Sequence, residues 1–347
     1  MRVLIVGPDP YSRGGIATLI RNMLQFDQKT VKYKMHVSTS DGSKRLKIFS
    51  VPLYSLFFAF RIIFSSYDII HIHISENMGF YRYVSYVLLS RLCGKKVVVH
   101  VHASKFDVFF SSQNKVFKKL IEFTLNQANL IITVGKKWGK VFTGLCKTKV
   151  ETVFNFITVP DEYCYNPESK KIITTGYIGS RKGYYDLINT LPDILKKNDN
   201  LQFVFCGNGE VDRVSEMAEK FGLEQNLTIT GWLSNDEVKL MLKESMIFVL
   251  PTYNEGMPLA ILEAMSYGLP VITTPVGDIP DLVTDPENGI LVTPGDLATL
   301  EKMILELAND RNRRVEISRR NYFKVKNEYS TSVCMRKIFS LYEQLLN

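Results

Sequence analysis

The chain has 347 residues, 46% of them hydrophobic and 22% charged, and a formal net charge of +8. This composition argues against a disordered or membrane-embedded chain. One hydrophobic core usually stops growing at ~250–300 residues, so the length predicts two domains. The 5 cysteines stand singly, without a C-x-x-C pair, which argues against a disulfide framework and favours a reducing compartment.

The N-terminal run MRVLIVGPDP leads directly into a strand-like segment, a pattern unlike a secretory signal, so we expect a cytoplasmic protein. The most apolar stretch is FSVPLYSLFFAFRIIFSS, residues 49–66. It is shorter than the ~20 apolar residues of a membrane span, and Pro52 and Arg61 interrupt it. It predicts a buried or surface-docked helix, with contact to one membrane leaflet as the alternative.

Charge is distributed unevenly along the chain. Residues 1–165 carry 23 Lys+Arg and 10 Asp+Glu, a net +13, whereas residues 166–347 carry 20 and 25, a net −5. A basic first half predicts an anionic partner, such as a phospholipid surface or a phosphate-bearing substrate. Nucleic acid is not expected, because zinc-finger, helix-turn-helix and RNP-like patterns are missing from the sequence.

Short β-rich runs alternate with helix-like stretches in both halves. In chain order, they are RVLIVG (2–7), DIIHIHI (68–74), KVVVHVH (96–102), NLIITVG (129–135), KVETVFN (149–155), IITTGYIG (172–179), LQFVFCG (201–207), NLTITGW (226–232), SMIFVLP (245–251) and LPVITTP (269–275). Continuous apolar runs of this kind predict parallel sheets covered on both faces. We expect two doubly wound α/β domains, residues 1–165 and 166–330, with ligands at the carboxyl ends of the strands.

Two glutamates flank an apolar run in NEGMPLAILEAMSYGLPVITT, residues 254–274. Because proline favours the first helical position, Pro258 predicts a helix from about Pro258 to Tyr267, ended by Gly268. The N-terminus of this helix would favour an anion such as a diphosphate. Glu255, in the preceding loop, suits sugar hydroxyls, and Glu263, in mostly apolar surroundings, suits ribose hydroxyls.

Other candidate residues also follow strands. Gly14 and Gly15 come after the first strand and open a helix, so the backbone could approach a phosphate or an acceptor closely, although a plain turn is the commoner meaning. Lys182 lies just after the run at 172–179, where its ammonium could neutralise a diphosphate, and Arg181 is a second candidate. Exposed, solvated lysine is the alternative for Lys182.

Four histidines lie on two predicted strands, as the pairs His71/His73 and His100/His102. Alternation along a strand places the members of each pair on one face. Imidazoles at this spacing could converge on zinc, which is the alternative to local hydrogen bonds. We expect the local hydrogen bonds and no metal site.

The stretch EGMPLAILEAMSYGLPVITTPVGDIPDLVTDPENGILVTPGD resembles the E-x7-E region of the retaining, GT-B-fold glycosyltransferases of family 4. The rest agrees in order: RGGIATLIRNML, DIIHIHIS, VVVHVHAS, KGYYDLI, and LQFVFCGNGE with its G-x-G turn. The chain departs from the family at Ser180, where an arginine usually follows the glycine that corresponds to Gly179. Arg181, the next residue, is the candidate to take its place.

The resemblance implies two Rossmann-like domains facing each other across a cleft, with domain closure gating turnover. The basic first domain would bind the acceptor, the second the nucleotide-sugar, and the last helix, 331–347, would return to the first domain. The implied reaction transfers a hexosyl group to an acceptor hydroxyl with retention. The basic first half and the aromatic helix at 53–64 predict that the acceptor is a glycan or a polyprenyl-linked oligosaccharide, in bacterial surface polysaccharide synthesis. No cofactor is implied, and the chain lacks the metal-binding D-x-D motif. The basic charge of the first domain, rather than the resemblance, predicts peripheral contact with an anionic membrane, at the inner face of the cell membrane.

Site residues also follow from the resemblance. The implied catalytic group consists of His102 near the reacting sugar, Lys182, Arg181 and Glu255. A UDP-sugar is the preferred donor over a GDP-sugar, and the implied donor-binding positions are Gly14, Gly15, Gly207, Gly209, Gly256, Met257, Pro258, Leu259 and Glu263. The alternatives are an epimerase or phosphorylase of the same fold, and a non-catalytic partner subunit of a glycan-assembly complex.

Overall fold

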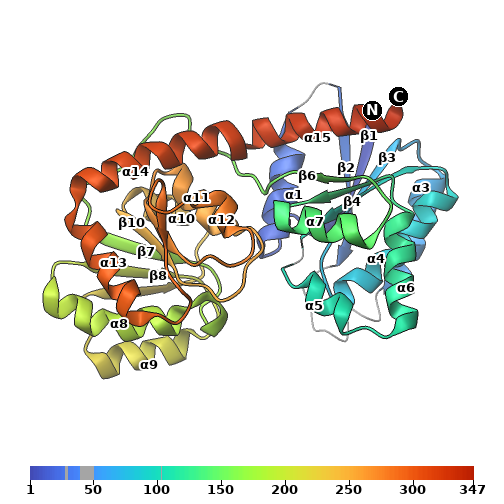
Figure 1. Ribbon diagram of the computed structural model, residues 1–347. Coiled ribbons are helices and arrows are strands. Elements are labelled where there is room, and N and C mark those ends of the chain that lie inside the picture. The colour runs from blue at the N-terminus through green and yellow to red at the C-terminus, as the bar shows by residue number, and fades with distance from the viewer. Residues whose placement is uncertain (28–29, 40–50, 103) are drawn as a thin grey trace. The chain divides into compact units, whose positions relative to one another are not determined.

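The computed structural model describes residues 1–27, 30–39, 51–102 and 104–347, which form two compact units (Figure 1). The first unit comprises Met1–Thr158 and Thr331–Asn347, and the second comprises Val159–Ser330. The division therefore falls after Thr158 rather than after residue 165. The reason is that the intervening segment packs on the second unit, where the Tyr165 hydroxyl donates to the Met246 carbonyl at 3.0 Å.

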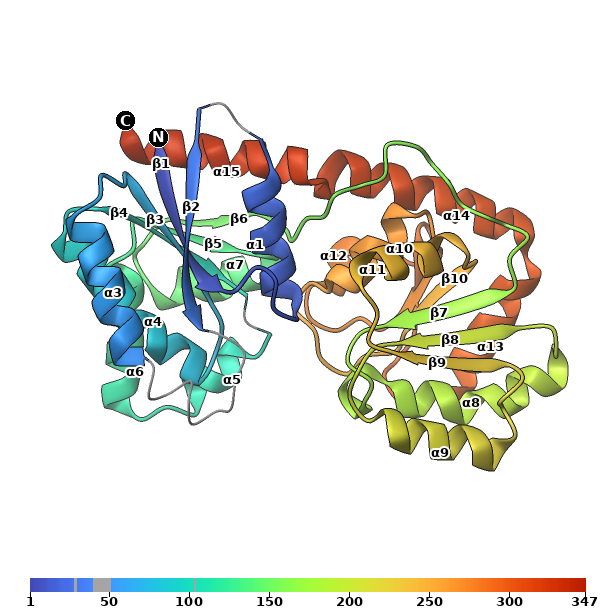
Figure 2. The ribbon, with the colours of Figure 1, turned by 180° about the vertical axis from the view of Figure 1, so that it is seen from behind.

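A parallel sheet forms the centre of the first unit (Figure 2). Within the described residues it has six strands in the order β2-β1-β3-β4-β5-β6. Its strands are β1 (Arg2–Pro8), β2 (Lys32–Thr39), β3 (Ile69–Ile74), β4 (Lys96–Val101), β5 (Leu130–Thr133) and β6 (Val150–Thr152). The side chains of β3 and β5 are buried throughout, as expected for apolar strands covered on both faces.

Helices cover both faces of this sheet. They are α1 (Gly15–Gln25), α3 (Val51–Ile63), α4 (Met78–Leu92), α5 (Phe106–Ser111), α6 (Lys115–Asn126), α7 (Lys136–Leu145) and α15 (Thr331–Leu346). Successive side chains of β1, such as Val3 and Leu4, point to opposite faces of the sheet and so enter different cores. One core lies under α1 and α15, and the other lies under α3 to α7.

The second unit contains another parallel sheet, with six strands among the described residues in the order β12-β11-β10-β7-β8-β9. Its strands are β7 (Lys171–Thr175), β8 (Gln202–Cys206), β9 (Leu227–Gly231), β10 (Ile247–Leu250), β11 (Val271–Thr273) and β12 (Gly289–Leu291). Every run that the sequence predicts as a strand overlaps a strand of one of the two sheets. Strands β2 and β12 were not predicted.

Helices also cover both faces of the second sheet (Figure 2). They are α8 (Tyr184–Lys197), α9 (Val211–Phe221), α10 (Asn235–Lys243), α11 (Leu259–Ser266), α12 (Ile279–Leu282), α13 (Leu297–Asn309) and α14 (Arg311–Lys324). A 3₁₀ turn, Ser180–Lys182, precedes α8, and a π-helical turn, Val325–Tyr329, follows α14. Helices α8, α9 and α13 share one core with the sheet, whereas α11 packs on α14.

Helix α3 lies within the apolar stretch at 49–66, as predicted. Phe58 and Ile62 are buried against the sheet, but most of its other large apolar side chains are exposed. The helix therefore docks on the surface rather than inside the core. None of the helices in the described ranges has both the length and the apolar content needed to cross a bilayer.

Helix α15 supplies part of the first unit's core, and this gives a stability prediction. Phe339 is 3% exposed and contacts the rings of Phe26 and Tyr33, whereas Phe123 on α6 is 51% exposed. Phe339→Ala should lower the free energy of unfolding by about 3–5 kcal/mol, through lost burial and the cavity left behind. Phe123→Ala, the matched control, should change it by less than about 1 kcal/mol.

Urea unfolding followed by the fluorescence of Trp138 measures this difference in the first unit, because Trp138 is buried there. The other tryptophan, Trp232, belongs to the second unit and can be replaced by phenylalanine in all samples. Equal losses for Phe339→Ala and Phe123→Ala would contradict the packing of α15 on this sheet.

Candidate functional site

The strand order of the second sheet creates a switch point between β7 and β10. The chain runs outward from β7 to β9 and then returns to pair β10 with β7 on the other side. In open α/β sheets, ligands bind outside the carboxyl ends of the strands at this point. The loops after β7 and β10 meet here: Tyr253 N–H and the Thr252 hydroxyl both donate to the Arg181 carbonyl at 2.9 Å.

Glycines shape the loop that carries Lys182. Gly183, directly after the 3₁₀ turn, has φ 74°, and a Cβ there would lie 2.0 Å from the Pro251 carbonyl oxygen. Another residue would therefore be strained in its backbone and would clash with the loop after β10. Glycine at 183 thus allows the turn with Lys182 to lie directly against that loop.

Three charged side chains meet at the switch point. The Lys182 ammonium lies 2.7 Å from Glu255 Oε1, and Arg181 Nη1 lies 3.0 Å from the same oxygen. Arg181 Nη1 also donates to the Asn254 carbonyl at 2.9 Å. Lys182 is 9% exposed and the Glu255 side chain is 12% exposed, so these two charges depend on each other as partners. The structure thus brings together the three residues of this unit that were predicted to be catalytic.

The Glu255 backbone is supported by a turn after β11. Gly277 has φ 62°, and a Cβ there would lie 2.0 Å from the Glu255 carbonyl oxygen. Asp278 N–H donates to the Gly256 carbonyl at 2.9 Å. This G-D-I-P turn lies in the stretch that carries the family resemblance, but none of its residues was predicted to belong to the site. The sequence feature that could have identified this turn is Gly277, which follows the predicted strand at 269–275.

Helix α11 begins one residue later than predicted. Pro258 is the N-cap, with an extended ψ of 122°, and the helical residues are Leu259–Ser266, so Pro258 is not the first of them. Tyr267 is the C-cap rather than the last helical residue, and Gly268 follows with φ 76°. Gly256 and Met257 lie in the loop that enters the helix, next to Glu255.

Glu263 occupies a half-buried position on α11, between residues that are buried. Burial raises the pKa of the neighbouring Tyr267 to about 12, and the negative charge of Glu263 adds to this rise. Tyr267 stands four residues after Glu263 in the chain, about one helical turn. Its contact with a ribose remains a prediction.

Gly207 and Gly209 allow two loops to pack backbone against backbone. A Cβ at Gly207 would lie 1.7 Å from the Gly176 carbonyl oxygen, and one at Gly209 would lie 2.3 Å from that of Ile178. Ile178 N–H donates to the Asn208 carbonyl at 2.7 Å, which fastens the loop after β7 to the loop after β8. This packing accounts for the two glycines, and their contact with a donor remains a prediction.

Gly14 and Gly15 lie after β1 in the first unit. Gly14 is the N-cap of α1 with φ 130°, and Gly15 is the first residue of the helix. A Cβ at Gly14 would have no described atom within 4 Å, so the backbone conformation, not lack of space, favours glycine there. A ligand contact at this turn remains a prediction.

The four strand histidines form hydrogen-bonded pairs across β3 and β4. His73 Nδ1 lies 2.8 Å from His102 Nε2, and His71 Nε2 lies 3.2 Å from His100 Nδ1. His71 Nδ1 also bonds the hydroxyl of Tyr342 on α15. Desolvation lowers the pKa of His71 and of His102 to about 3 and holds the pKa of the other two well below its usual range. All four imidazoles are therefore neutral near pH 7.

Three of these histidines also keep the metal alternative open. His71, His73 and His100 each offer a ring nitrogen, and these nitrogens lie within 4.8 Å of one another. Neutral imidazole is the form that binds zinc. Metal analysis of the purified protein decides between an ion and the hydrogen-bonded pairs.

Residues 160–323 match the family model described as glycosyl transferases group 1. The match covers 164 of the 347 residues, most of the second unit. The match confirms the resemblance to glycosyltransferases that the sequence indicated. Lys182, Glu255 and the whole of α11 lie inside the matched segment, so the ion pair and the helix N-terminus belong to the part of the chain that resembles the family.

Curated relatives with glycosyltransferase names match parts of the chain. An uncharacterized glycosyltransferase of Methanocaldococcus jannaschii is 24% identical over 253 residues, which cover 66% of this chain and 63% of the relative. The capsular polysaccharide biosynthesis glycosyltransferase CapM of Staphylococcus aureus is 28% identical over 174 residues, covering 49% and 46%. The matched part of this chain thus spans 63% and 46% of the lengths of these relatives.

Solved structures match nearly the whole chain. Sucrose-phosphate synthase of Thermosynechococcus elongatus has a TM-score of 0.79 at 14% identity and covers 99% of this chain and 98% of its own. HepE of Anabaena, solved in complex with UDP, has a TM-score of 0.76 at 15% identity and covers 99% and 100%. At such low identities, structural similarity establishes the fold alone. It confirms the predicted two-domain α/β class of GT-B type.

The histidine pairs predict a pH dependence of stability. In the unfolded chain a histidine has a pKa of about 6.5, whereas His71 and His102 are held near about 3 in the folded protein. Below pH 6.5 the unfolded chain therefore binds protons that the folded protein does not. The free energy of unfolding should be highest above that pH and fall as pH is lowered towards 3.

Urea unfolding of the first unit at a series of pH values measures the effect, again through Trp138 fluorescence. His71→Asn should reduce the slope below pH 6.5 by about one proton, whatever it does to the stability at pH 7. A free energy of unfolding that does not change between pH 7 and pH 5 would contradict neutral, desolvated imidazoles.

Proposed function

We propose that the protein is a glycosyltransferase that transfers a hexosyl group from a nucleoside-diphosphate sugar to an acceptor hydroxyl. The observation that carries this proposal is the Lys182–Glu255 ion pair at the switch point, inside the segment that matches the group 1 family model. A mostly buried ammonium beside a carboxylate offers one group for a phosphate and one for sugar hydroxyls. The glycosyltransferase names of the curated relatives support the same activity.

In this proposal the diphosphate of the donor binds to Lys182, Arg181 and the N-terminus of α11. The two cations already lie within 3.0 Å of one oxygen, so a diphosphate could engage both. The N-terminus of α11, which has no side-chain cap, adds a favourable dipole. Arg181 would thereby take the part of the arginine that Ser180 replaces.

The sugar and the ribose would be held by the two glutamates. A carboxylate accepts two hydroxyl hydrogen bonds, so Glu255 would orient the hexose beside the cations that bind its leaving group. Glu263 would accept hydroxyl bonds from the ribose. His102 is neutral and can donate or accept a hydrogen bond to the sugar without adding charge.

The proposed transfer retains the configuration at the anomeric carbon. The bond from that carbon to the diphosphate oxygen breaks, and the acceptor oxygen forms a new bond on the same face. The acceptor's proton passes to the departing diphosphate oxygen, and Lys182 and Arg181 stabilise the negative charge that develops there. No metal is required, because these cations supply the positive charge.

The acceptor in this proposal is a glycan or a polyprenyl-linked oligosaccharide, bound by the basic first unit. Relatives named for capsular polysaccharide, colanic acid and amylovoran biosynthesis support a role in bacterial surface polysaccharide synthesis. UDP is the preferred nucleotide because HepE, a structure of the same fold, was solved in complex with it.

Release of nucleoside diphosphate from a panel of UDP-, GDP- and ADP-sugars, with EDTA present, tests the function. Slow hydrolysis of one donor is expected, and its loss in Glu255→Ala would tie the release to this site. Donor binding without release, also in the presence of lipid-linked and glycan acceptors, would instead assign the protein to the non-catalytic role.

Lys182→Gln should lower the rate of donor turnover by about 100-fold or more, because the departing diphosphate loses its nearest cation. Lys220→Gln, a change of the same kind at an exposed position on α9, should leave the rate unchanged. The measurement is the initial rate of nucleotide release at saturating donor. Equal rates for the two variants would remove Lys182 from the mechanism.

Glu263→Ala should raise the KM for the donor about tenfold or more, because a ribose contact made in both the bound and the transition states is lost. The turnover rate at saturating donor should change much less. A donor titration of initial rates separates the two constants. An unchanged KM would contradict the ribose assignment.

A further inference from the structure

An exposed apolar stripe runs along helix α3 in the first unit. Its members share one helical face at spacings of three and four residues and are each more than half exposed: Leu53, Leu56, Phe57, Phe60, Ile63 and Phe64. Phe60 and Phe64 stack with ring centroids 6.1 Å apart. Apolar side chains gathered in this way mark an interaction surface rather than isolated exposure.

The stripe itself carries no charge. Arg61 is the sole charged residue of α3, and its guanidinium points back into the unit. Its Nη1 donates to the Met35 carbonyl at 2.6 Å, and its Nε donates to the Tyr67 hydroxyl at 3.2 Å. Both donations fix Arg61 away from the exposed face. The outer surface of α3 is therefore apolar along its length.

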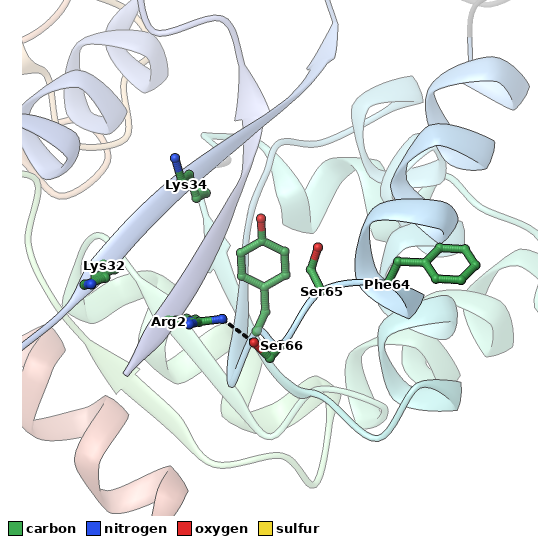
Figure 3. A pocket seen from close by; sticks show the side chains of 7 residues that line it. Arg2, Lys32, Lys34, Phe64, Ser65 and Ser66 are labelled. Carbon is green, nitrogen blue, oxygen red and sulfur yellow. Dashed lines mark hydrogen bonds between the residues drawn. The ribbon is translucent and has the colours of Figure 1, made fainter.

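A basic pocket continues the stripe at its C-terminal end. Figure 3 shows the pocket, which has a volume of about 380 Å³ and is lined by Arg2, Lys32, Lys34, Phe64, Ser65, Ser66 and Tyr67. Arg2 donates to the Ser66 hydroxyl, and Phe64 belongs to both the stripe and the pocket. Among the described residues that line it there are three cations and no carboxylate.

The pocket lies at the opposite edge of the sheet from Gly14 and His102, the predicted site residues of this unit. Arg2 and Lys32 are the first residues of β1 and β2, whereas Gly14 and His102 follow the carboxyl ends of β1 and β4. The strands are parallel, so these two groups of residues are separated by the length of the sheet. A ligand in this pocket would therefore not compete with the chemistry proposed above.

We propose that the α3 stripe and the basic pocket together bind the surface of an anionic phospholipid membrane. The stripe enters the boundary between headgroups and acyl chains, and the pocket takes the phosphate of a headgroup through Arg2, Lys32 and Lys34. Charge complementarity decides for a membrane, because anionic lipid presents phosphate and apolar chain side by side, as this surface requires. The three cations match the headgroups, and the uncharged stripe matches the layer beneath them.

This inference goes beyond the transfer reaction and does not depend on it. It rests on residues of the first unit alone, whereas the proposed donor site lies in the second unit. A protein that fails to release nucleotide could still bind vesicles, and a protein that fails to bind vesicles could still release nucleotide. The two proposals therefore fail separately.

Flotation of the full chain with phosphatidylcholine vesicles, with and without phosphatidylglycerol, tests the proposal. The protein should float with the anionic vesicles, bind the neutral ones at least about tenfold more weakly, and lose most of the difference at high salt. Inorganic phosphate at moderate concentration should not release it, because the stripe holds the protein to the bilayer and not to phosphate alone.

Two surface variants separate the contributions. Lys32→Glu with Lys34→Glu should weaken binding to anionic vesicles about tenfold or more, and Lys140→Glu with Lys220→Glu, the same change of net charge elsewhere, should weaken it much less. Phe57→Ser with Phe60→Ser should abolish binding to both kinds of vesicle. Circular dichroism melting checks that each variant remains folded.

Three outcomes would overturn the proposal. The first is that the protein does not float with anionic vesicles. The second is that both charge-reversal pairs weaken binding equally, since the pocket would then have no specific part. The third is a dimer in solution, detected by light scattering, that dissociates in the Phe57→Ser, Phe60→Ser variant, because the stripe would then bind a second copy of the chain.

Discussion

The ion pair between Lys182 and Glu255 is the interaction around which the candidate site of the second unit is arranged. Both side chains are largely buried, so each charge requires the other as a partner. The pair forms because β10 returns to lie beside β7, which brings two loops distant in sequence together. Gly183 and Gly277 let the backbones approach closely enough for the side chains to meet.

The buried polar groups of the first unit are neutral rather than charged. Four imidazoles lie across β3 and β4, and burial keeps them neutral, so they pair by hydrogen bonds rather than by charge. The positive charge of this unit lies at its surface, for example at the pocket of Arg2, Lys32 and Lys34. One unit therefore offers buried charge suited to an anionic donor, and the other offers neutral polar groups inside and cations outside.

Much of the fold could be predicted from the sequence, because continuous valine and isoleucine runs identify buried parallel strands. The exceptions have physical reasons: β2 reads KYKMHVST, in which charged residues interrupt the apolar pattern, and β12 begins at Gly289 directly after Asn288, a pair typical of turns. The sequence placed Lys182 and Glu255 after strands, but their contact depends on strand order, which periodicity does not determine. It likewise identified an apolar helix at 49–66, whereas which face of α3 stays exposed depends on tertiary packing.

Calorimetric titration with UDP, which lacks the sugar, tests the central claim most directly, namely that Glu255 holds Lys182 ready for a diphosphate. Lys182→Met should weaken UDP binding about tenfold or more, through the loss of a charge-assisted hydrogen bond. Glu255→Gln should leave the affinity unchanged or increase it, because it removes the carboxylate that competes for Lys182. Equal affinity of Lys182→Met and the unaltered protein, or weaker binding by Glu255→Gln alone, would contradict the account.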